Sequence, residues 1–244
     1  MNENGQAHHG SLVDVNVDVL PLNLIEMLNA TIDETRHNWY PVDGRRESAM
    51  AESFANLLRE NACFQAIEAQ ACTAAQLWAT TMLRREVVDE PLHVLRCVGP
   101  DADSQSYLRH FDSHILTMLV PLRFAPDGDR NGDLIMHALQ RDANSAIANL
   151  LIKTYLFFEH GLPFFIRRAL SSRALSNGNS QRVVCTPGNV YIFNGLIVLH
   201  HNLDVVVGER RMLIIHHYDA GLTRGARSVI RSFRMLRDRL AGMY

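Results

Sequence analysis

The feature that most constrains the fold of this chain is the division of its β-type sequence into two separate blocks. The first block spans residues 91–136 and contains the runs Leu92–Val98, Tyr107–Phe111 and Ile115–Phe124. The second block spans residues 181–220 and contains the runs Val183–Val184, Val190–Phe193 and Arg211–Tyr218. Ile115–Phe124 is mostly apolar, which is typical of a strand buried on both faces. We therefore expect the two blocks to form one mainly β core.

Helical patterns flank and separate these blocks. The N-terminal part (residues 1–90) and an insert (residues 137–180) carry apolar residues at helical spacing, over Leu24–Ile32, Ser48–Leu83, Ala143–Phe158 and Phe164–Ala174. A basic C-terminal helix is predicted for residues 221–244. Because β-rich domains often reach this length, we interpret residues 1–244 as a single domain with helices around its core.

Composition excludes several classes of partner. The formal net charge is −2, so no basic field is present to attract nucleic acid. No apolar run is long enough to predict a membrane span. The four cysteines form no CxxC pair, and the N-terminus lacks the order of a secretory signal. We expect a cytoplasmic protein with no nucleic-acid or membrane partner.

The strongest chemical signal is His110-Phe111-Asp112 at the end of a predicted strand. Strand side chains alternate, so a spacing of two puts the imidazole and the carboxylate on one face. A histidine from a second strand would complete a triad of two histidines and one carboxylate. That triad leaves positions open on an octahedral iron(II). The candidate is His200 or its neighbour His201, and only one of these two can face the metal.

Two arginines follow the second histidine. Arg210 and Arg211 come directly after Gly208-Glu209. The planar guanidinium of arginine can bind a carboxylate through two charge-assisted hydrogen bonds. Either arginine is therefore a candidate to bind an organic acid that shares the site with the metal.

Together these motifs resemble the iron(II)/2-oxoglutarate-dependent dioxygenase superfamily. The residues that carry the resemblance are His110-x-Asp112, the pattern P-G-x-x-x-x-F-x-G-x-x-x-x-H from Pro187 to His200, and the G-x-R that ends at Arg210. The phytanoyl-CoA-hydroxylase-like and prolyl-hydroxylase-like branches are most similar. The matching segments make up less than a quarter of the chain, and the helical regions match no family pattern.

The resemblance implies a fold, a set of cofactors and a reaction. The fold would be a double-stranded β-helix, a cupin-like jelly roll. His110, Asp112 and His200 would bind iron(II), with His200 favoured over His201 by its distance from the arginines. Arg210, or else Arg211, would bind the far carboxylate of 2-oxoglutarate. With oxygen, the enzyme would hydroxylate a substrate and release succinate and carbon dioxide.

The sequence departs from the family pattern at one position and matches it at another. Those branches often carry Ser or Thr two residues after the arginine, where this chain has Met212 or Leu213. Asp112 favours hydroxylation over halogenation, because related halogenases lack this carboxylate. Desaturation, epoxidation and ring closure would use the same ligands and stay open.

The substrate is expected to be a small molecule, such as an amino acid or a natural-product intermediate. The oligomeric state stays open. Aromatic and basic residues offer possible pocket positions, at Trp39, Tyr40, Tyr107, Arg109 and Arg123.

Other interpretations use some of the same residues. A cupin-like zinc or other metal hydrolase or isomerase, or a non-catalytic β-helix binding module, could share the fold. His114 extends the first motif to His-x-Asp-x-His, which could suit zinc. Asp127–Gly132 matches the start of a calcium loop, but residue twelve of that loop is Ala138, so a hairpin turn is favoured. One of His216 and His217 is expected to face the core interior.

Overall fold

The computed structural model describes residues 12–35, 44–84, 86–100, 106–125 and 131–220. The C-terminal helix expected for 221–244 lies outside the described residues, as do Trp39, Tyr40 and residues 126–130 of the expected turn. Within the described ranges, no helix combines the length and apolar character needed to cross a lipid bilayer.

The core consists of two antiparallel sheets. The larger sheet has the order β1-β6-β3-β8-β2. Its strands, in that order, are Asp14–Asn16, Val190–Asn194, His114–Arg123, Arg210–Asp219 and Leu92–Val98. The smaller sheet has the order β5-β4-β7, formed by Ser180–Val183, Leu134–Gln140 and Val198–Asn202. Both sheets combine strands from both sequence blocks, so the expected mainly β core with flanking helices is confirmed.

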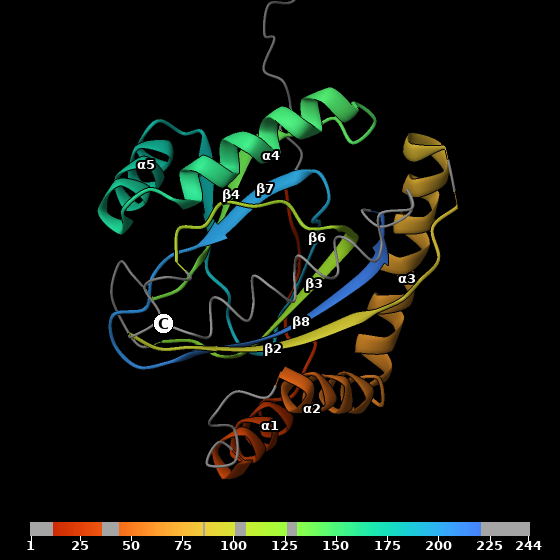
Figure 1. Ribbon diagram of the computed structural model, residues 1–244. Coiled ribbons are helices and arrows are strands. Elements are labelled where there is room, and N and C mark those ends of the chain that lie inside the picture. Colours follow the sequence, from red (N-terminus) through yellow and green to blue (C-terminus); the bar gives the residue numbers. More distant parts are fainter. Residues whose placement is uncertain (1–11, 36–43, 85, 101–105, 126–130, 221–244) are drawn as a thin grey trace, which may run out of the picture.

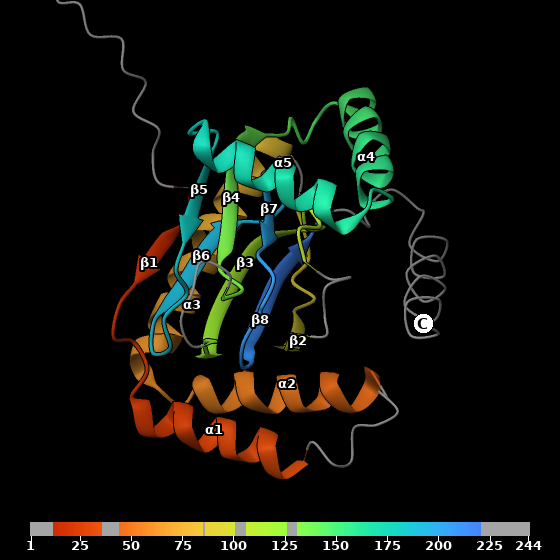
Figure 2. The ribbon, with the colours of Figure 1, turned by 90° about the vertical axis from the view of Figure 1, so that its left-hand side faces the viewer.

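Helices lie on two sides of this core (Figures 1 and 2). Three helices and a short π-helical turn precede β2: α1 (Leu22–Thr35), α2 (Gly44–Leu58), α3 (Ala62–Trp78) and η2 (Ala79–Leu83). They pack against the larger sheet. Two helices form the insert, α4 (Ala146–His160) and α5 (Phe164–Ser176), and α5 contacts the smaller sheet.

Strand alternation divides the apolar residues into two layers. On β3, Met118 and Val120 belong to the layer shared with α1, α2 and α3. Leu119 lies between them on the opposite face and packs with Phe193 and Met136, in the space between the two sheets. Each strand of the larger sheet therefore presents one face to the helices and the other to the interior.

Several predicted boundaries are wrong. The single helix expected over Ser48–Leu83 is interrupted, because Asn61 caps the start of α3 by accepting a hydrogen bond from the Phe64 backbone N–H at 3.0 Å. Tyr107–Phe111 forms no regular strand and has only an isolated bridge at His110. β1 lies in the part predicted to be helical, and β4 continues to Gln140 rather than ending at residue 136.

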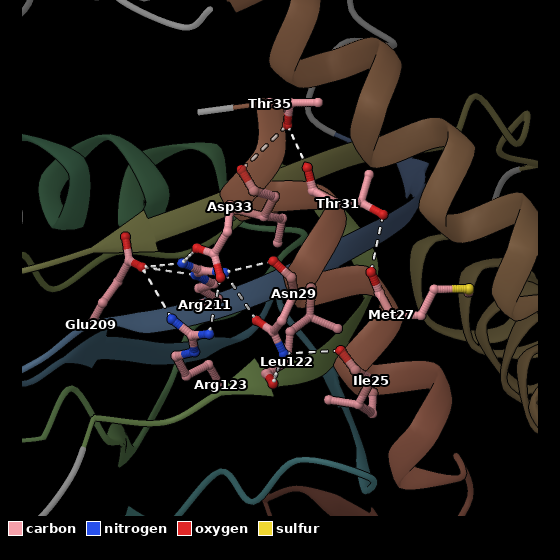
Figure 3. Close-up of polar contacts among 11 residues, drawn as sticks. Ile25, Met27, Asn29, Thr31, Asp33, Thr35, Leu122, Arg123, Glu209 and Arg211 are labelled. Atoms are coloured by element: carbon pink, nitrogen blue, oxygen red, sulfur yellow. Dashed lines mark hydrogen bonds and ion pairs between the residues drawn. The ribbon is translucent and has the colours of Figure 1, made fainter. Parts of the chain in front are cut away.

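Arg211 anchors α1 to β8 from the helix-facing side of the sheet (Figure 3). Its side chain is 1% exposed. It donates to the Asn29 carbonyl oxygen at 3.1 Å and to Glu209 at 2.8 Å, and it forms an ion pair with Asp33. The Asn29 amide in turn donates to the Leu122 carbonyl oxygen at 2.7 Å. The buried charge is therefore fully engaged in packing the helix against the sheet.

Replacing Arg211 should destabilise the fold. The substitution Arg211→Ala takes a buried donor from the Asn29 carbonyl oxygen and a cation from Asp33 and Glu209, so the free energy of unfolding should fall by about 3 kcal/mol. Arg123→Ala is the matched control, because Arg123 is 42% exposed where it pairs with Asp33, and its loss should cost less than about 1 kcal/mol. Urea unfolding measures both values, and equal losses would contradict the anchoring role of Arg211.

Candidate metal centre

The centre is organised by a backbone pairing between His110 and His200. The His110 N–H donates to the His200 carbonyl oxygen at 2.9 Å, and the His200 N–H donates back to the His110 carbonyl oxygen at 3.0 Å. Opposed residues of such an antiparallel pair place their side chains on the same face. The two imidazole rings accordingly lie 4.4 Å apart, centroid to centroid.

Each imidazole is oriented by a hydrogen bond to the backbone carbonyl oxygen two residues before it. The Nδ1–H of His110 donates to the Leu108 carbonyl oxygen at 2.9 Å, and that of His200 donates to the Val198 carbonyl oxygen at 3.0 Å. A carbonyl oxygen can only accept, so the proton of each neutral ring lies on Nδ1 and Nε2 keeps its lone pair. Histidines that bind metals are commonly held in this way by their second nitrogen.

Asp112 completes the group. Its Oδ1 lies 3.7 Å from His110 Nε2, and its Oδ2 lies 3.6 Å from His200 Nε2. Its backbone N–H donates to the Gly195 carbonyl oxygen at 2.8 Å, and the Thr117 hydroxyl donates to Oδ2 at 2.6 Å. The carboxylate is therefore fixed through both its backbone and its side chain.

Asp112 and Thr117 lie so close to residue 195 that this residue must be glycine. A Cβ atom at residue 195 would lie 2.9 Å from Asp112 Cβ and would overlap both Asp112 Oδ2 and Thr117 Oγ1. The glycine in the F-x-G part of the sequence motif thus has a steric reason.

The electrostatics suit a divalent cation. Burial and the neighbouring His200 together lower the pKa of His110 to about 4, although Asp112 acts in the opposite direction. Burial tends to raise the pKa of Asp112, but the adjacent histidines and the Thr117 hydrogen bond hold it well below its usual range. At neutral pH His110 and Asp112 thus offer unprotonated donors, as metal binding requires.

One donor atom each from His110, Asp112 and His200 lies within 4.8 Å of the others. Two imidazole nitrogens and one carboxylate oxygen are the donor set of a facial iron(II) triad. The residues present therefore fit the metal that the sequence motif implies.

His201 points away from this centre. Its Nδ1 lies 3.0 Å from His137 Nε2, and its Nε2 lies 2.8 Å from the Ser171 hydroxyl of α5. The structure thus brings His200, and not His201, to His110 and Asp112, as strand alternation requires.

The two arginines are separated in the same way. Arg210 lies on the interior face of β8, is 5% exposed, and donates from Nη1 to the Gly132 carbonyl oxygen at 2.9 Å. Its buried Nε has no hydrogen-bond partner among the described residues. His216 shares this face, with Nδ1 3.8 Å from Asp112 Oδ2. Arg211 faces α1, so it cannot serve the metal centre.

The remaining sequence candidates have other contacts. His114 is the first residue of β3, and its ring stacks on the ring of His216 with 4.9 Å between the centroids. It does not belong to the group of possible metal ligands formed by His110, Asp112 and His200. The Tyr107 hydroxyl donates to Asp204 at 2.5 Å. Arg109 pairs with Glu159 of α4, and Arg123 pairs with Asp33.

Three residues of the centre were missed from the sequence. Thr117 bonds Asp112 and also lies 3.1 Å from His216 Nδ1. Arg141 donates to the Asp112 carbonyl oxygen at 3.1 Å and to Leu196, joining the two loops of the centre. Arg96 pairs with Met212 across β2 and β8, so it shares the face of Arg210. A charged residue inside the run Leu92–Val98 was the only available signal for Arg96.

Comparison with models of known protein families gives no match, and comparison with curated proteins gives none. Solved structures do match. A prolyl-4-hydroxylase from Pseudomonas putida is 14% identical over 85% of this chain and 88% of its own, with a TM-score of 0.44. An N-substituted L-amino acid dioxygenase from Burkholderia ambifaria, in complex with alpha-KG, is 12% identical over 86% and 87%, with a TM-score of 0.42. AviO1 from Streptomyces viridochromogenes is 16% identical over 85% and 89%, with a TM-score of 0.46. At these identities and TM-scores, the assignment of the site rests on the residues of this chain.

Adding one methyl group at residue 195 should displace Asp112. Gly195→Ala forces the carboxylate away from both histidines, so iron(II) affinity should fall by at least about tenfold, as when a ligand loses its orienting contacts. Gly99→Ala is the matched control, since its Cβ would meet only the Gly208 carbonyl oxygen at 3.8 Å. Equilibrium dialysis with iron(II) measures both variants, and unchanged affinity in Gly195→Ala would remove Asp112 from the ligand set.

Proposed function

We propose that this chain is a non-haem iron(II)- and 2-oxoglutarate-dependent oxygenase that hydroxylates a small molecule. The products from the co-substrate would be succinate and carbon dioxide. The observation that carries the proposal is the combination, in the interior between the two sheets, of a two-histidine, one-carboxylate cluster and a buried arginine with an unused donor. We also propose that residues 1–244 form one domain whose two sheets make a double-stranded β-helix.

His110, Asp112 and His200 would hold the iron. When bound with 2-oxoglutarate and oxygen, iron(II) supplies the oxidising chemistry that introduces one oxygen atom into a substrate C–H bond. The protein supplies the positions of the ligands. Thr117 and Gly195 hold the Asp112 carboxylate against both imidazoles, and the side chains of Asp112 and His200 are 11% and 7% exposed.

Arg210 would bind the far carboxylate of 2-oxoglutarate. A buried guanidinium forms strong charge-assisted hydrogen bonds with a carboxylate, and the Nε of Arg210 has no protein partner among the described residues. Arg96 supplies a second cation beside Met212, the position where the related branches often carry a hydroxyl residue. The positive charges of Arg96 and Arg210 would thus replace the hydrogen bond that the absent hydroxyl residue would give to the co-substrate.

The alternatives differ in what they require. A zinc hydrolase or isomerase on this fold would use the three ligands but would leave Arg210 without a role. A non-catalytic binding module would require neither an open metal position nor the co-substrate. Succinate formation that depends on iron(II) and 2-oxoglutarate separates the proposed oxygenase from both.

Removing the carboxylate should abolish turnover. Asp112→Ala deletes one of three ligands, so succinate formation in the presence of iron(II), oxygen and 2-oxoglutarate should fall to background. Asp142→Ala serves as a control, because Asp142 is exposed and outside the cluster. Succinate released per minute is the measurement, and full activity in Asp112→Ala would refute the proposed ligand set.

Neutralising Arg210 should mainly weaken the binding of 2-oxoglutarate. Arg210→Met removes a buried charge partner worth about 3 kcal/mol, so KM for 2-oxoglutarate should rise by roughly 100-fold. kcat at saturating 2-oxoglutarate should change much less, because the metal ligands are untouched. Arg123→Met, at an exposed arginine, should leave KM unchanged. If Arg210→Met bound 2-oxoglutarate as tightly as the unmodified chain, the proposed role of Arg210 would be wrong. Arg96 would then be the next candidate to bind the co-substrate.

A further inference from the structure

A second group of potential metal ligands lies on the opposite face of β8. Cys72 of α3, Asp89 of the segment before β2 and His217 of β8 each place one ligand atom within 4.8 Å of the others. Because His216 and His217 are neighbours on one strand, they point to opposite faces. This second group is therefore separated from the candidate iron centre by the sheet itself.

His217 has a carboxylate at each ring nitrogen. Its Nδ1 lies 2.9 Å from Asp89 Oδ2, and its Nε2 lies 3.2 Å from Glu68 Oε1. A neutral imidazole has only one N–H, so it can satisfy only one of these carboxylates. The contact between the other nitrogen and its carboxylate requires either a second proton on the ring or a cation that both groups bind.

Protonation is one way to meet this requirement. Burial alone would lower the pKa of His217, but the contacts with Asp89, Cys72 and Glu68 raise it to about 11. A divalent cation between Asp89 and Nδ1 is the other way, and the nearby thiol of Cys72 offers that cation a third ligand.

We propose that Cys72, Asp89 and His217 form a second metal site, of the zinc class, independent of the proposed oxygenase activity. Thiolate, imidazole and carboxylate are the ligands that zinc takes in proteins. The metal would join α3, the segment before β2 and the end of β8, three parts of the chain that are distant in sequence.

The surroundings of the site support a ligand role for His217. When Nδ1 binds the metal, Nε2–H donates to Glu68, which reproduces the carboxylate–histidine–zinc arrangement. Glu68 is 7% exposed and is held in place by Arg59, which donates to its two oxygens at 2.8 and 2.7 Å. The histidine is thus fixed from the side opposite the metal.

Metal binding at this group needs no oxidant or reductant. It forms bonds from the metal to Cys72 Sγ, Asp89 and His217 Nδ1, and a proton held on Sγ or on Nδ1 leaves to solvent as the metal takes its place.

Cobalt(II) distinguishes this site from the iron centre, because only Cys72 provides a sulfur ligand. Cobalt(II) alone, added without oxygen to the full chain after chelator treatment, should give an intense near-ultraviolet sulfur-to-cobalt band. The band should be lost in Cys72→Ser and retained in Cys63→Ser, an exposed cysteine on the same helix. It should also be retained in Asp112→Ala, and metal analysis of that cobalt-loaded variant should find one cobalt per chain.

A further variant guards against misfolding. The Asp89 side chain is 33% exposed, so Asp89→Asn should fold, and it should weaken cobalt(II) binding by at least about tenfold. Absence of the sulfur-to-cobalt band in the unmodified chain, or its survival in Cys72→Ser, would overturn the proposal and leave His217 as a purely protonated ion-pair partner.

Discussion

The reciprocal backbone hydrogen bonds between His110 and His200 are the constraint on which the rest of the centre depends. They join two segments that are far apart in sequence and set both imidazoles on one side of the backbone. Once this pair is in place, Asp112 needs only one more backbone bond, to Gly195, to bring its carboxylate to both rings. The candidate metal centre is thus a consequence of this backbone pairing between the two β blocks.

Strand β8 shows how one run of residues serves two purposes. Its interior face carries Arg210 and His216, and His216 Nδ1 lies 3.8 Å from Asp112 Oδ2. Its outer face carries Arg211 and His217, which contact α1 and α3. Two adjacent Arg residues and two adjacent His residues therefore have different roles, because alternation sends each neighbour to a different environment.

Much of this arrangement could be predicted from the sequence. The run Leu92–Val98 is β2, and Ile115–Phe124 differs from β3 by one residue at each end. Both depend on local apolar pattern, which the sequence displays directly. The ligand spacing was also sufficient to select His110 and Asp112, although the reason differs. No regular strand holds them, and the pairing with His200 does so instead.

What could not be predicted depends on long-range contacts. Arg96 reaches the interior only because β2 pairs with β8, and Thr117 matters only because its register places it beside His216. Asn61 interrupts an apolar helical pattern by a capping bond that periodicity does not reveal.

The measurement that tests the central claim most directly is the visible spectrum of the chain after anaerobic addition of iron(II) and 2-oxoglutarate. A weak charge-transfer band that requires both additions and is lost in Asp112→Ala is the expected result, whereas no band from the unmodified chain would contradict an iron and 2-oxoglutarate site.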